Sequence, residues 1–535
     1  MRADPDRLHS GDVALSPGTL TALARRVPAL PLRLVFGAAL VLLGVGAAAV
    51  AEAFDERQAA IEVAVNRPVN AGAVDLADIR ANNSPTLVRN PRNGRELAVA
   101  NRIDSPRFSC GLHISRDGGT RWAQIPIPAP AGEEPKCFAP DAAFDADGDL
   151  YLSFVTLRGR GNVPHAVWLS RLEGGRLSKP VKLLGPLSFQ VRLVADPVKP
   201  GRLYLTWLKA SDVGLYQFSQ TGNPVAFMRT DDGGRSWQRP VTVSPPQRER
   251  VIAPSLAVGP DGELHVLYLD LRDDRLDYAG AHEGQGGAPY PGPWELALAR
   301  STDGGRTWSD SVVDPNVKPT ERIIVFIPPF PSLAADPDSG RLYASFHDGR
   351  LGDPDVLLWT SSDGGRSWSE PKRVNDTRQG DGRAQYLPKL AVAPNGRLDV
   401  LYYDRRRDPR NVLNEVSIQS SVDSGETFSQ HLRFSERRFD SRIGFGAERK
   451  LPDLGSRLGL VSTDAAALAV WTDTRAGTDA SLKQDLAAGL VRFSQPARLS
   501  GGLEAALLYG GILLAMLGLS LLGWLALERR RSRGP

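Results

Sequence analysis

Short apolar segments separated by Asp, Asn and Gly turns recur along most of this chain. In one unit, an apolar segment from Val251 to Val258 leads into the turn Pro260-Asp261-Gly262. A second segment, from Leu264 to Tyr268, follows the turn at once. Apolar residues that alternate with a period of two, bounded by turn residues, predict β-strands. The unit is therefore predicted to be a pair of antiparallel strands.

The second strand of this unit can be followed through the chain. It begins with an apolar residue, and from the second unit onward an aromatic residue follows four positions later. A repeat of this length predicts one ring-shaped or stacked domain built from similar units. The predicted second strands start at Leu97, Leu150, Leu203, Leu264, Leu342, Leu398 and about Ala467.

The two ends of the repeat complement each other. The last unit runs out after Phe493, one strand short of a complete unit, while residues 61–65 alternate ahead of the first unit. We predict that residues 61–65 supply the missing outer strand of the last unit. A ring closed in this way leaves no open sheet edge between its first and last units.

An octapeptide of the form Ser-x-Asp-Gly-Gly-x-Ser/Thr-Trp recurs five times, most clearly from Ser301 to Trp308. Its two glycines can adopt the positive φ that a tight hairpin turn requires, and its Asp can accept backbone N–H groups across the turn. The fifth copy has Phe428 in place of Trp. The five turn carboxylates are Asp117, Asp232, Asp303, Asp363 and Asp423.

These octapeptides resemble the Asp box, or bacterial neuraminidase (BNR) repeat, of the sialidase superfamily. In that superfamily the box closes the hairpin between the third and fourth strands of a β-propeller blade, on the face away from the active site. The resemblance covers residues 61–494 and implies an all-β fold. Counting the repeats predicts a seven-bladed β-propeller. Catalytic sialidases usually have six blades, so a six-bladed ring is the alternative.

Uncharged runs near both ends predict membrane segments. Residues 505–527 exceed the roughly 20 residues that span a bilayer, and a basic tail at 528–535 follows. This pattern predicts a transmembrane helix with a cytoplasmic C-terminus. Residues 34–53, after a predicted cytoplasmic segment at 1–33, read as a signal anchor or as a signal peptide. The basic flanks place everything between the two runs outside the cytoplasm, held at the cell membrane.

The overall charge and the cysteines add two expectations. Lys and Arg number 65 against 61 Asp and Glu, which gives no reason to expect a nucleic-acid partner. The two cysteines, Cys110 and Cys137, fall where the third strand of blade one and the first strand of blade two begin. Both strands start on the same face of a propeller. We therefore predict a disulfide between them, formed in an oxidising compartment.

A charged motif recurs in the loops after the second strands, on the face opposite the Asp boxes. Its Asp and Arg side chains either surround the mouth of the channel, where they would bind a glycan or protein ligand, or tie each loop to the next blade. In the second unit only the Arg of the motif is present, as Arg158. Arg383, on another loop and close to Tyr386 in the chain, is a further candidate. The candidate ligand-binding residues are Arg158, Asp270, Arg272, Asp348, Arg350, Arg383, Asp404, Arg406, Asp473 and Arg475.

The resemblance also implies where catalytic residues should lie. The superfamily holds a substrate carboxylate with three arginines, one of them in an Arg-Ile-Pro motif on the first blade. Pro85 matches the Pro of that motif, which puts Asn83 at the arginine position. Tyr386 is the candidate nucleophile by position, with Glu249 and Glu321 as candidate partners.

No histidine spacing indicates a metal site, and no cofactor is predicted. Residues 270–277, with four Asp, are the one calcium candidate.

Two functions remain. The first is a non-catalytic surface propeller that binds glycan or protein or serves as a scaffold, and the second is an exo-α-sialidase type glycoside hydrolase. Asn83, the seven repeats and the membrane segments favour the non-catalytic module.

Overall fold

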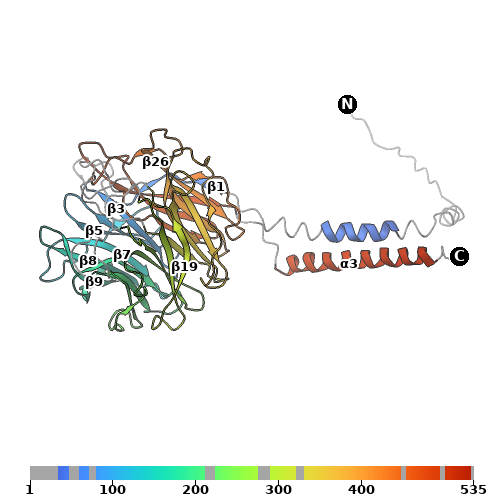
Figure 1. Ribbon diagram of the computed structural model, residues 1–535, viewed down its shortest axis with the longest axis horizontal. Helices are drawn as coiled ribbons and strands as arrows, with labels where there is room; N and C mark the ends of the chain where they lie inside the picture. The colour runs from blue at the N-terminus through green and yellow to red at the C-terminus, as the bar shows by residue number, and fades with distance from the viewer. Residues whose placement is uncertain are drawn as a thin grey trace, which may run out of the picture. The chain divides into compact units, whose positions relative to one another are not determined.

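A computed structural model describes residues 34–46, 60–70, 80–210, 223–274, 290–320, 330–446, 454–494 and 501–531. The chain divides into two compact units. One is Ala60–Phe493, and the other contains both terminal segments, Met1–Ala59 and Ser494–Pro535 (Figure 1).

The strands of Ala60–Phe493 form seven antiparallel sheets, which are the blades of a propeller. Each sheet is built from strands that follow one another in the chain, apart from the last. Blade 1 consists of β3 (Asn82–Arg89), β4 (Leu97–Ile103), β5 (Ser109–Ser115) and β6 (Ala123–Gln124). Blade 2 consists of β7 (Cys137–Phe144), β8 (Leu150–Arg158), β9 (Val163–Glu173), β10 (Arg176–Leu177) and β11 (Val181–Leu184). Blade 3 consists of β12 (Ser188–Ala195), β13 (Leu203–Lys209), β14 (Val225–Thr230) and β15 (Val241–Thr242). Blade 4 consists of β16 (Val251–Val258), β17 (Leu264–Asp270), β18 (Trp294–Ser301) and β19 (Ser309–Val317). Blade 5 consists of β20 (Ser332–Ala335), β21 (Leu342–Asp348), β22 (Asp355–Ser361) and β23 (Lys372–Arg373). Blade 6 consists of β24 (Gln385–Val392), β25 (Leu398–Asp404), β26 (Leu413–Ser421), β27 (Leu432–Arg433) and β28 (Phe439–Asp440). Blade 7 consists of β29 (Gly459–Thr463), β30 (Ala466–Asp473), β31 (Asp485–Phe493), β1 (Ala60–Val63) and β2 (Arg67–Pro68).

The second strand of each blade lies where the apolar pattern predicts it. Six of the seven starts agree to the residue, and the seventh, Ala466, lies one residue before the predicted Ala467. The strands β4, β17, β21 and β25 are buried along their whole length. A strand covered on both faces by neighbouring blades can be apolar at nearly every position, which explains why its pattern is so strong.

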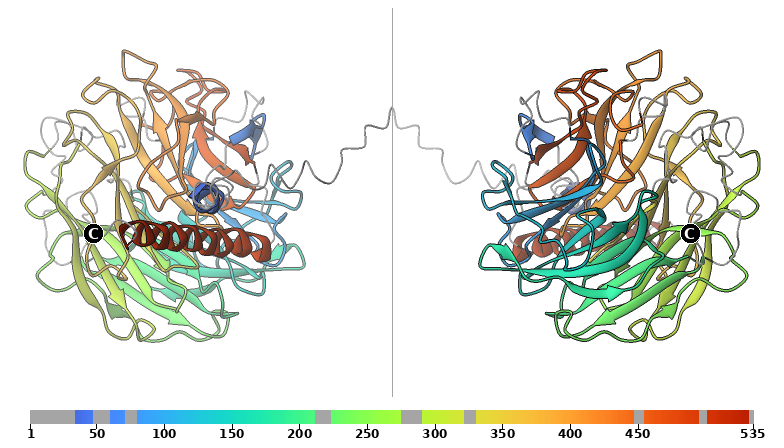
Figure 2. Two further views of the ribbon diagram at one scale, coloured as in Figure 1. Left: turned by 90° about the vertical axis from the view of Figure 1, so that its right-hand side faces the viewer. Right: turned by 90° about the vertical axis from the view of Figure 1, so that its left-hand side faces the viewer.

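The ring is closed by the N-terminal strand, as predicted. In β1, Glu62 pairs with Arg492 and Val63 pairs with Val491 of β31, and the two strands are antiparallel. Figure 2 shows this blue strand against the orange strands of the last blade. The pairing covers a backbone edge that would otherwise be exposed, and it joins residues more than 400 positions apart in the chain.

The five octapeptides form the turns that leave the third strands of their blades. In the turn at Asp303, Ser301 Oγ donates to the carboxylate (2.8 Å) and accepts from the backbone N–H of Gly305 (2.9 Å). The same carboxylate accepts the backbone N–H of Thr307 (3.0 Å). Gly304 and Gly305 have φ of 75° and 88°, a conformation that glycine adopts without strain. In two other copies the hydroxyls of Ser236 and Ser367 donate to Asp232 and Asp363, and together with the backbone N–H groups of the same two serines they lower the pKa of each carboxyl to about 2.

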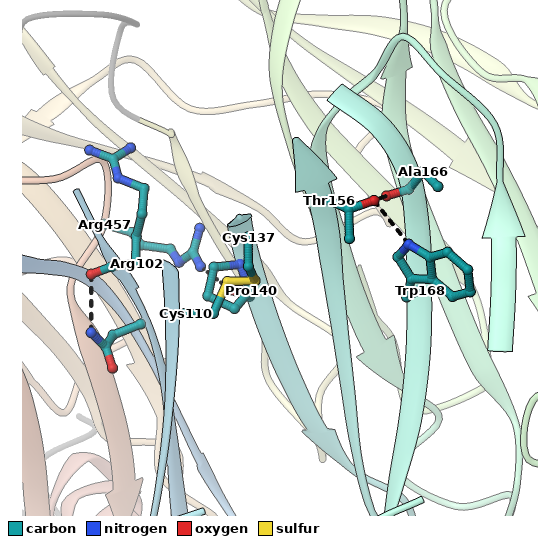
Figure 3. Close-up of a disulfide and its surroundings, with 9 residues drawn as sticks. Arg102, Cys110, Cys137, Pro140, Thr156, Ala166, Trp168 and Arg457 are labelled. Atoms are coloured by element: carbon teal, nitrogen blue, oxygen red, sulfur yellow. Dashed lines mark hydrogen bonds between the residues drawn. A yellow bond between two sulfur atoms is a disulfide. The ribbon is translucent and has the colours of Figure 1, made fainter. Parts of the chain in front are cut away.

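The predicted disulfide is confirmed. Cys110 in β5 and Cys137 at the start of β7 are bonded, with their Cα atoms 5.5 Å apart (Figure 3). The rings of Phe108 and Phe138 meet edge to face beside the bond, with centroids 5.6 Å apart. The cross-link therefore joins blade 1 to blade 2 next to an apolar contact between the same two blades.

The second unit contains α3 (Gly501–Arg531), which is consistent with the predicted C-terminal membrane helix. An 18-residue window of its segment Tyr509–Arg529 has a mean hydropathy of 2.1, so the segment is long and apolar enough to cross a membrane by length and composition. The predicted N-terminal membrane segment, residues 34–53, is only partly described. The described helix there is Leu34–Gly46, which covers about 20 Å of a hydrocarbon core of about 30 Å. Residues 47–53 of the predicted segment lie outside the described residues, so the N-terminal membrane segment stays a prediction.

Candidate functional site

The centre of the propeller is built from the first strands of the blades, which share a local irregularity. In each of five blades, one residue of the first strand has a positive φ, and these residues are Ser84, Ala139, Gln190, Ala253 and Leu387. The pairing with the second strand then skips, so that Asn83 pairs with Arg102 but Thr86 pairs with Ala100. A bulge of this kind bends the strand and re-aims the side chains that follow.

A polar side chain occupies the same register position of the first strand in six blades. Each of the six pairs with the fourth residue of its blade's second strand, and they are Thr86, Asp141, Arg192, Ser255, Ser332 and Lys389. Blade 7 contributes Arg457 from the segment ahead of β29. We refer to these seven residues as the channel ring. Six of them, all except Asp141, line a cavity of about 80 Å³ among the described residues.

Hydrogen bonds from the channel ring connect neighbouring blades. Thr86 Oγ1 donates to Asp141 in the next blade (2.7 Å), and Asp141 accepts the backbone N–H of Leu193 in the blade after that (2.9 Å). Ser255 Oγ donates to the Pro331 carbonyl oxygen (2.6 Å). The ring therefore has a structural role in holding the first strands together around the channel.

The cations of the ring are less fully partnered. Arg192 Nε lies 3.4 Å from Asp141, and its Nη1 is buried without a hydrogen-bond partner among the described residues. Arg457 donates to Thr86 Oγ1 (3.0 Å) and to the Pro140 carbonyl oxygen (2.6 Å), next to the disulfide (Figure 3). Burial and then the nearby Arg192 lower the pKa of Lys389 to about 8 and that of Arg457 to about 9.

Sequence reasoning missed the channel ring, although the sequence carries a signal for it. Five ring residues directly follow a proline of the first strand, in the pairs Pro85-Thr86, Pro140-Asp141, Pro254-Ser255, Pro331-Ser332 and Pro388-Lys389. Aligning the residue after this proline across the repeats would have revealed a ring of polar side chains in an otherwise apolar strand.

The repeated Asp-x-Arg motif forms a local turn at the end of each second strand. In all four copies the backbone N–H of the Arg donates to the Asp carboxylate two residues earlier. The N–O distances are 3.0 Å for Arg272 to Asp270, 2.6 Å for Arg350 to Asp348, 2.9 Å for Arg406 to Asp404 and 2.8 Å for Arg475 to Asp473. These bonds fix the backbone of the loop on the face opposite the octapeptide turns.

The guanidinium groups of the motif also make ion pairs. Arg350 contacts Asp314 of blade 4 (2.9 Å), and Arg406 contacts Asp376, which follows blade 5 (2.6 Å). Arg475 reaches Glu436, between β27 and β28 of blade 6 (3.5 Å). Arg272 differs, since it pairs within its own blade with Glu295 (2.6 Å). Three of the four therefore tie their loop to the preceding blade, whereas the sequence suggested the next blade. Ligand binding by these side chains stays a prediction.

The other two predicted arginines lie on separate loops. Arg158 is exposed at the end of β8 and donates to the Gly132 carbonyl oxygen (3.1 Å). Arg383 lies before β24, and its backbone N–H donates to Asp381 (2.9 Å) and Asp353 (3.1 Å). Neither side chain lines the central cavity.

The candidate nucleophile Tyr386 is fully buried. Its hydroxyl donates to Asn414 Oδ1 (3.1 Å), and the guanidinium of Arg405 lies 5.0 Å from the centre of its ring. Burial raises the pKa of this phenol above its usual value. Among the predicted partners, Glu249 is exposed in the connection before β16, while Glu321 lies outside the described residues.

Asn83, at the position matched to the superfamily's arginine, is also buried. Its Nδ2 donates to Asp104 Oδ2 (2.8 Å), which accepts from Arg102 Nε as well (2.9 Å). The pair Arg102 and Asp104 is almost fully enclosed. Arg102 is thus an arginine close to the predicted place, but its charge is balanced by Asp104.

The calcium candidate at residues 270–277 is only partly described. Asp270 accepts from Arg248 Nη1 (3.1 Å), and Asp274 accepts from Trp294 Nε1 (2.8 Å). Residues 275–277 lie outside the described part. Within the described ranges, no group of three or more His, Cys, Asp or Glu side chains is arranged to hold a metal ion. The calcium prediction is therefore not tested.

Comparisons with known proteins give partial matches. No protein-family model matches the chain. A xyloglucanase of Paenibacillus sp is 29% identical over 184 residues, which are 33% of this chain and 16% of that enzyme. A sialidase of Micromonospora viridifaciens is 34% identical over 131 residues, which are 22% of this chain and 18% of that enzyme. The solved structure of Hadza microbial sialidase Hz136 aligns with a TM-score of 0.41 at 14% identity, over 78% of this chain and 66% of that one.

The class of the protein follows from the fold. The chain is a seven-bladed β-propeller, and its predicted resemblance to sialidases is confirmed over the part that matches the Micromonospora viridifaciens sialidase. The matched parts amount to less than a fifth of the length of each of the two enzymes.

Proposed function

We propose that this protein is a membrane-anchored, extracytoplasmic propeller that binds glycan or protein as a recognition or scaffold module and does not catalyse glycoside hydrolysis. The observation that carries the proposal is the burial of Tyr386, whose hydroxyl is hydrogen-bonded to Asn414 inside the core. A nucleophile must come within bonding distance of the substrate, and a fully enclosed phenol does not.

The state of the matched arginine position supports the same proposal. Asn83 carries no charge, and the nearby Arg102 is neutralised by Asp104 at 2.7 Å. A guanidinium engaged in an almost fully buried ion pair has little capacity left for a substrate carboxylate. The guanidinium groups of Arg272, Arg350 and Arg475 on the Asp-x-Arg face are partly exposed, and this face is the recognition surface that we propose.

A substrate assay tests the enzymatic alternative. We expect the detergent-solubilised full chain to turn over a fluorogenic sialoside no faster than its Tyr386→Phe variant. Tyr403→Phe is the matched control, because Tyr403 is also fully buried and its hydroxyl also makes a hydrogen bond, to the Thr472 carbonyl oxygen (3.2 Å). Efficient turnover that is lost in Tyr386→Phe but kept in Tyr403→Phe would establish the exo-α-sialidase instead. A glycan array probed with the same preparation tests the binding function.

A topology experiment tests the membrane placement. The positively charged residues after Tyr509–Arg529 favour a cytoplasmic C-terminus, and the disulfide favours an oxidising compartment for the propeller. We expect protease added to intact spheroplasts to digest the propeller while an epitope tag added after Pro535 stays protected. A digested tag together with a protected propeller would show the inverse topology.

A further inference from the structure

The channel ring holds more positive charge than its own carboxylate balances. Arg192, Lys389 and Arg457 line the cavity, and Asp141 beside them is the one acidic residue of the ring. Both oxygens of Asp141 already accept hydrogen bonds, one from Thr86 Oγ1 (2.7 Å) and the other from the backbone N–H of Leu193 (2.9 Å). Three cations and one carboxylate leave an excess of two positive charges within the ring.

Donor groups around the cavity lack acceptors in the described part of the chain. The Lys389 ammonium forms no hydrogen bond or ion pair there, and Arg192 Nη1 is buried and unpartnered. Ser332 Oγ accepts the backbone N–H of Leu390 (2.9 Å), which leaves its own proton available to a ligand. These three groups come from blades 3, 5 and 6, so an acceptor among them would be held from several sides.

Uncompensated cations in a half-buried site are unfavourable, because burial removes their hydration and their mutual repulsion is poorly screened. Burial, followed by the repulsion from Arg192, lowers the pKa of both Lys389 and Arg457. An oxyanion would relieve the repulsion and accept from guanidinium, ammonium and hydroxyl groups together. The volume of about 80 Å³ holds a few water molecules or one small anion, well below the roughly 300 Å³ of pockets that bind larger ligands.

We propose that the channel ring is a binding site for a small inorganic oxyanion of the sulfate or phosphate class, coordinated by Arg192, Lys389 and Arg457. The bound anion connects blades 3, 6 and 7 across the channel and so stabilises the closed ring. This site lies within the channel and is independent of the glycan- or protein-binding surface proposed above.

Sulfate is a suitable probe, because it stays doubly charged across the working pH range. We expect isothermal titration calorimetry of the full chain in detergent, at pH 7 and at constant ionic strength set with sodium chloride, to show saturable binding of sulfate. Lys389→Met should weaken the affinity about tenfold or more, since it removes one charged hydrogen bond. Lys199→Met, at an exposed position outside the cavity, is the control and should leave the affinity unchanged.

Two further measurements separate a ligand site from a structural role. In chloride alone, Lys389→Met should unfold at the same or a higher temperature than wild type, because the substitution removes a repelling charge. The groups that face Lys389 are Arg192, Arg457 and Asp141. As the pH rises through about 8, Lys389 loses its proton, so the sulfate affinity of the wild type should fall, and this step should be absent from Lys389→Met.

Arg192→Gln provides a second variant, so the proposal can still be tested if Lys389→Met does not fold. Saturable binding that weakens in either variant supports the site. Folded wild-type protein without saturable sulfate binding, or binding that survives both Lys389→Met and Arg192→Gln, overturns it.

Discussion

Replacing Asp399 with alanine is expected to lower the free energy of unfolding by about 3–5 kcal/mol, the cost typical of leaving one charge of a buried pair uncompensated. Arg397 and Asp399 lie at the start of β25, the second strand of blade 6, and both side chains are almost completely buried. Arg397 Nε is 3.0 Å from Oδ1 of Asp399, and Arg397 Nη2 is 3.0 Å from Oδ2. The substitution removes both contacts at once.

The surroundings of this ion pair explain why its loss should be costly. Asp399 also accepts from Ser420 Oγ and from Ser462 Oγ, both at 2.6 Å, and Ser462 belongs to blade 7. Arg397 donates to the Thr463 carbonyl oxygen (2.8 Å) and lies over the ring of Phe493, 3.7 Å from its centre. The pair therefore joins blade 6 to the blade that closes the ring, and its loss should weaken closure.

Urea unfolding followed by tryptophan fluorescence measures this effect. Asp261→Ala, an exposed position in a turn between strands, serves as the control and should change stability by less than about 0.5 kcal/mol. The double variant Arg397→Met/Asp399→Leu removes both charges and should recover much of the loss, because no unpaired charge remains. An Asp399→Ala variant as stable as Asp261→Ala would show that the pair contributes little.

Removing the disulfide is expected to lower the free energy of unfolding by about 3.5 kcal/mol, the loop-entropy value for a sequence separation of 27 residues. The bond links blade 1 to blade 2. Its main effect is to reduce the number of conformations that the unfolded chain can adopt. The double variant Cys110→Ser/Cys137→Ser should therefore unfold at lower denaturant concentration while keeping the seven-bladed fold.

Reduction of the wild-type protein provides the matched comparison. Dithiothreitol should shift the unfolding midpoint of wild type toward that of the double variant and should leave the double variant unchanged. Thiol labelling of the unfolded protein before and after treatment verifies that the bond was present and then reduced. A fully reduced wild type with an unchanged midpoint would contradict the prediction.

The strand pattern and the turns could be read from the sequence because both depend on local chemistry. The second strand of a blade is covered on both faces, so its apolar run is continuous and its start is sharp, as at Leu264 and Leu398. The turn at Asp303 is made by residues within one octapeptide. Closure by β1 could be predicted because the last unit lacks one strand and an extra strand precedes the first unit.

The sequence was less informative about the candidate site, because the site depends on contacts between blades. Tyr386 was a candidate nucleophile by its position in the chain, but it is buried because Arg405 and Tyr403 pack around it. The direction of the ion pair between Arg350 and Asp314, toward the preceding blade, follows from how neighbouring blades pack around the ring.

Taken by itself, the sequence determined the number of repeats, the starts of the second strands, the hairpin turns, the partner of the open edge and the disulfide. Each of these rests on periodicity, on turn chemistry or on the alternating direction of antiparallel strands. Only the tertiary structure decided which polar side chains meet. Arg192, Lys389 and Arg457 are widely separated in the chain, and they share one cavity because the first strands of all blades converge on a single channel.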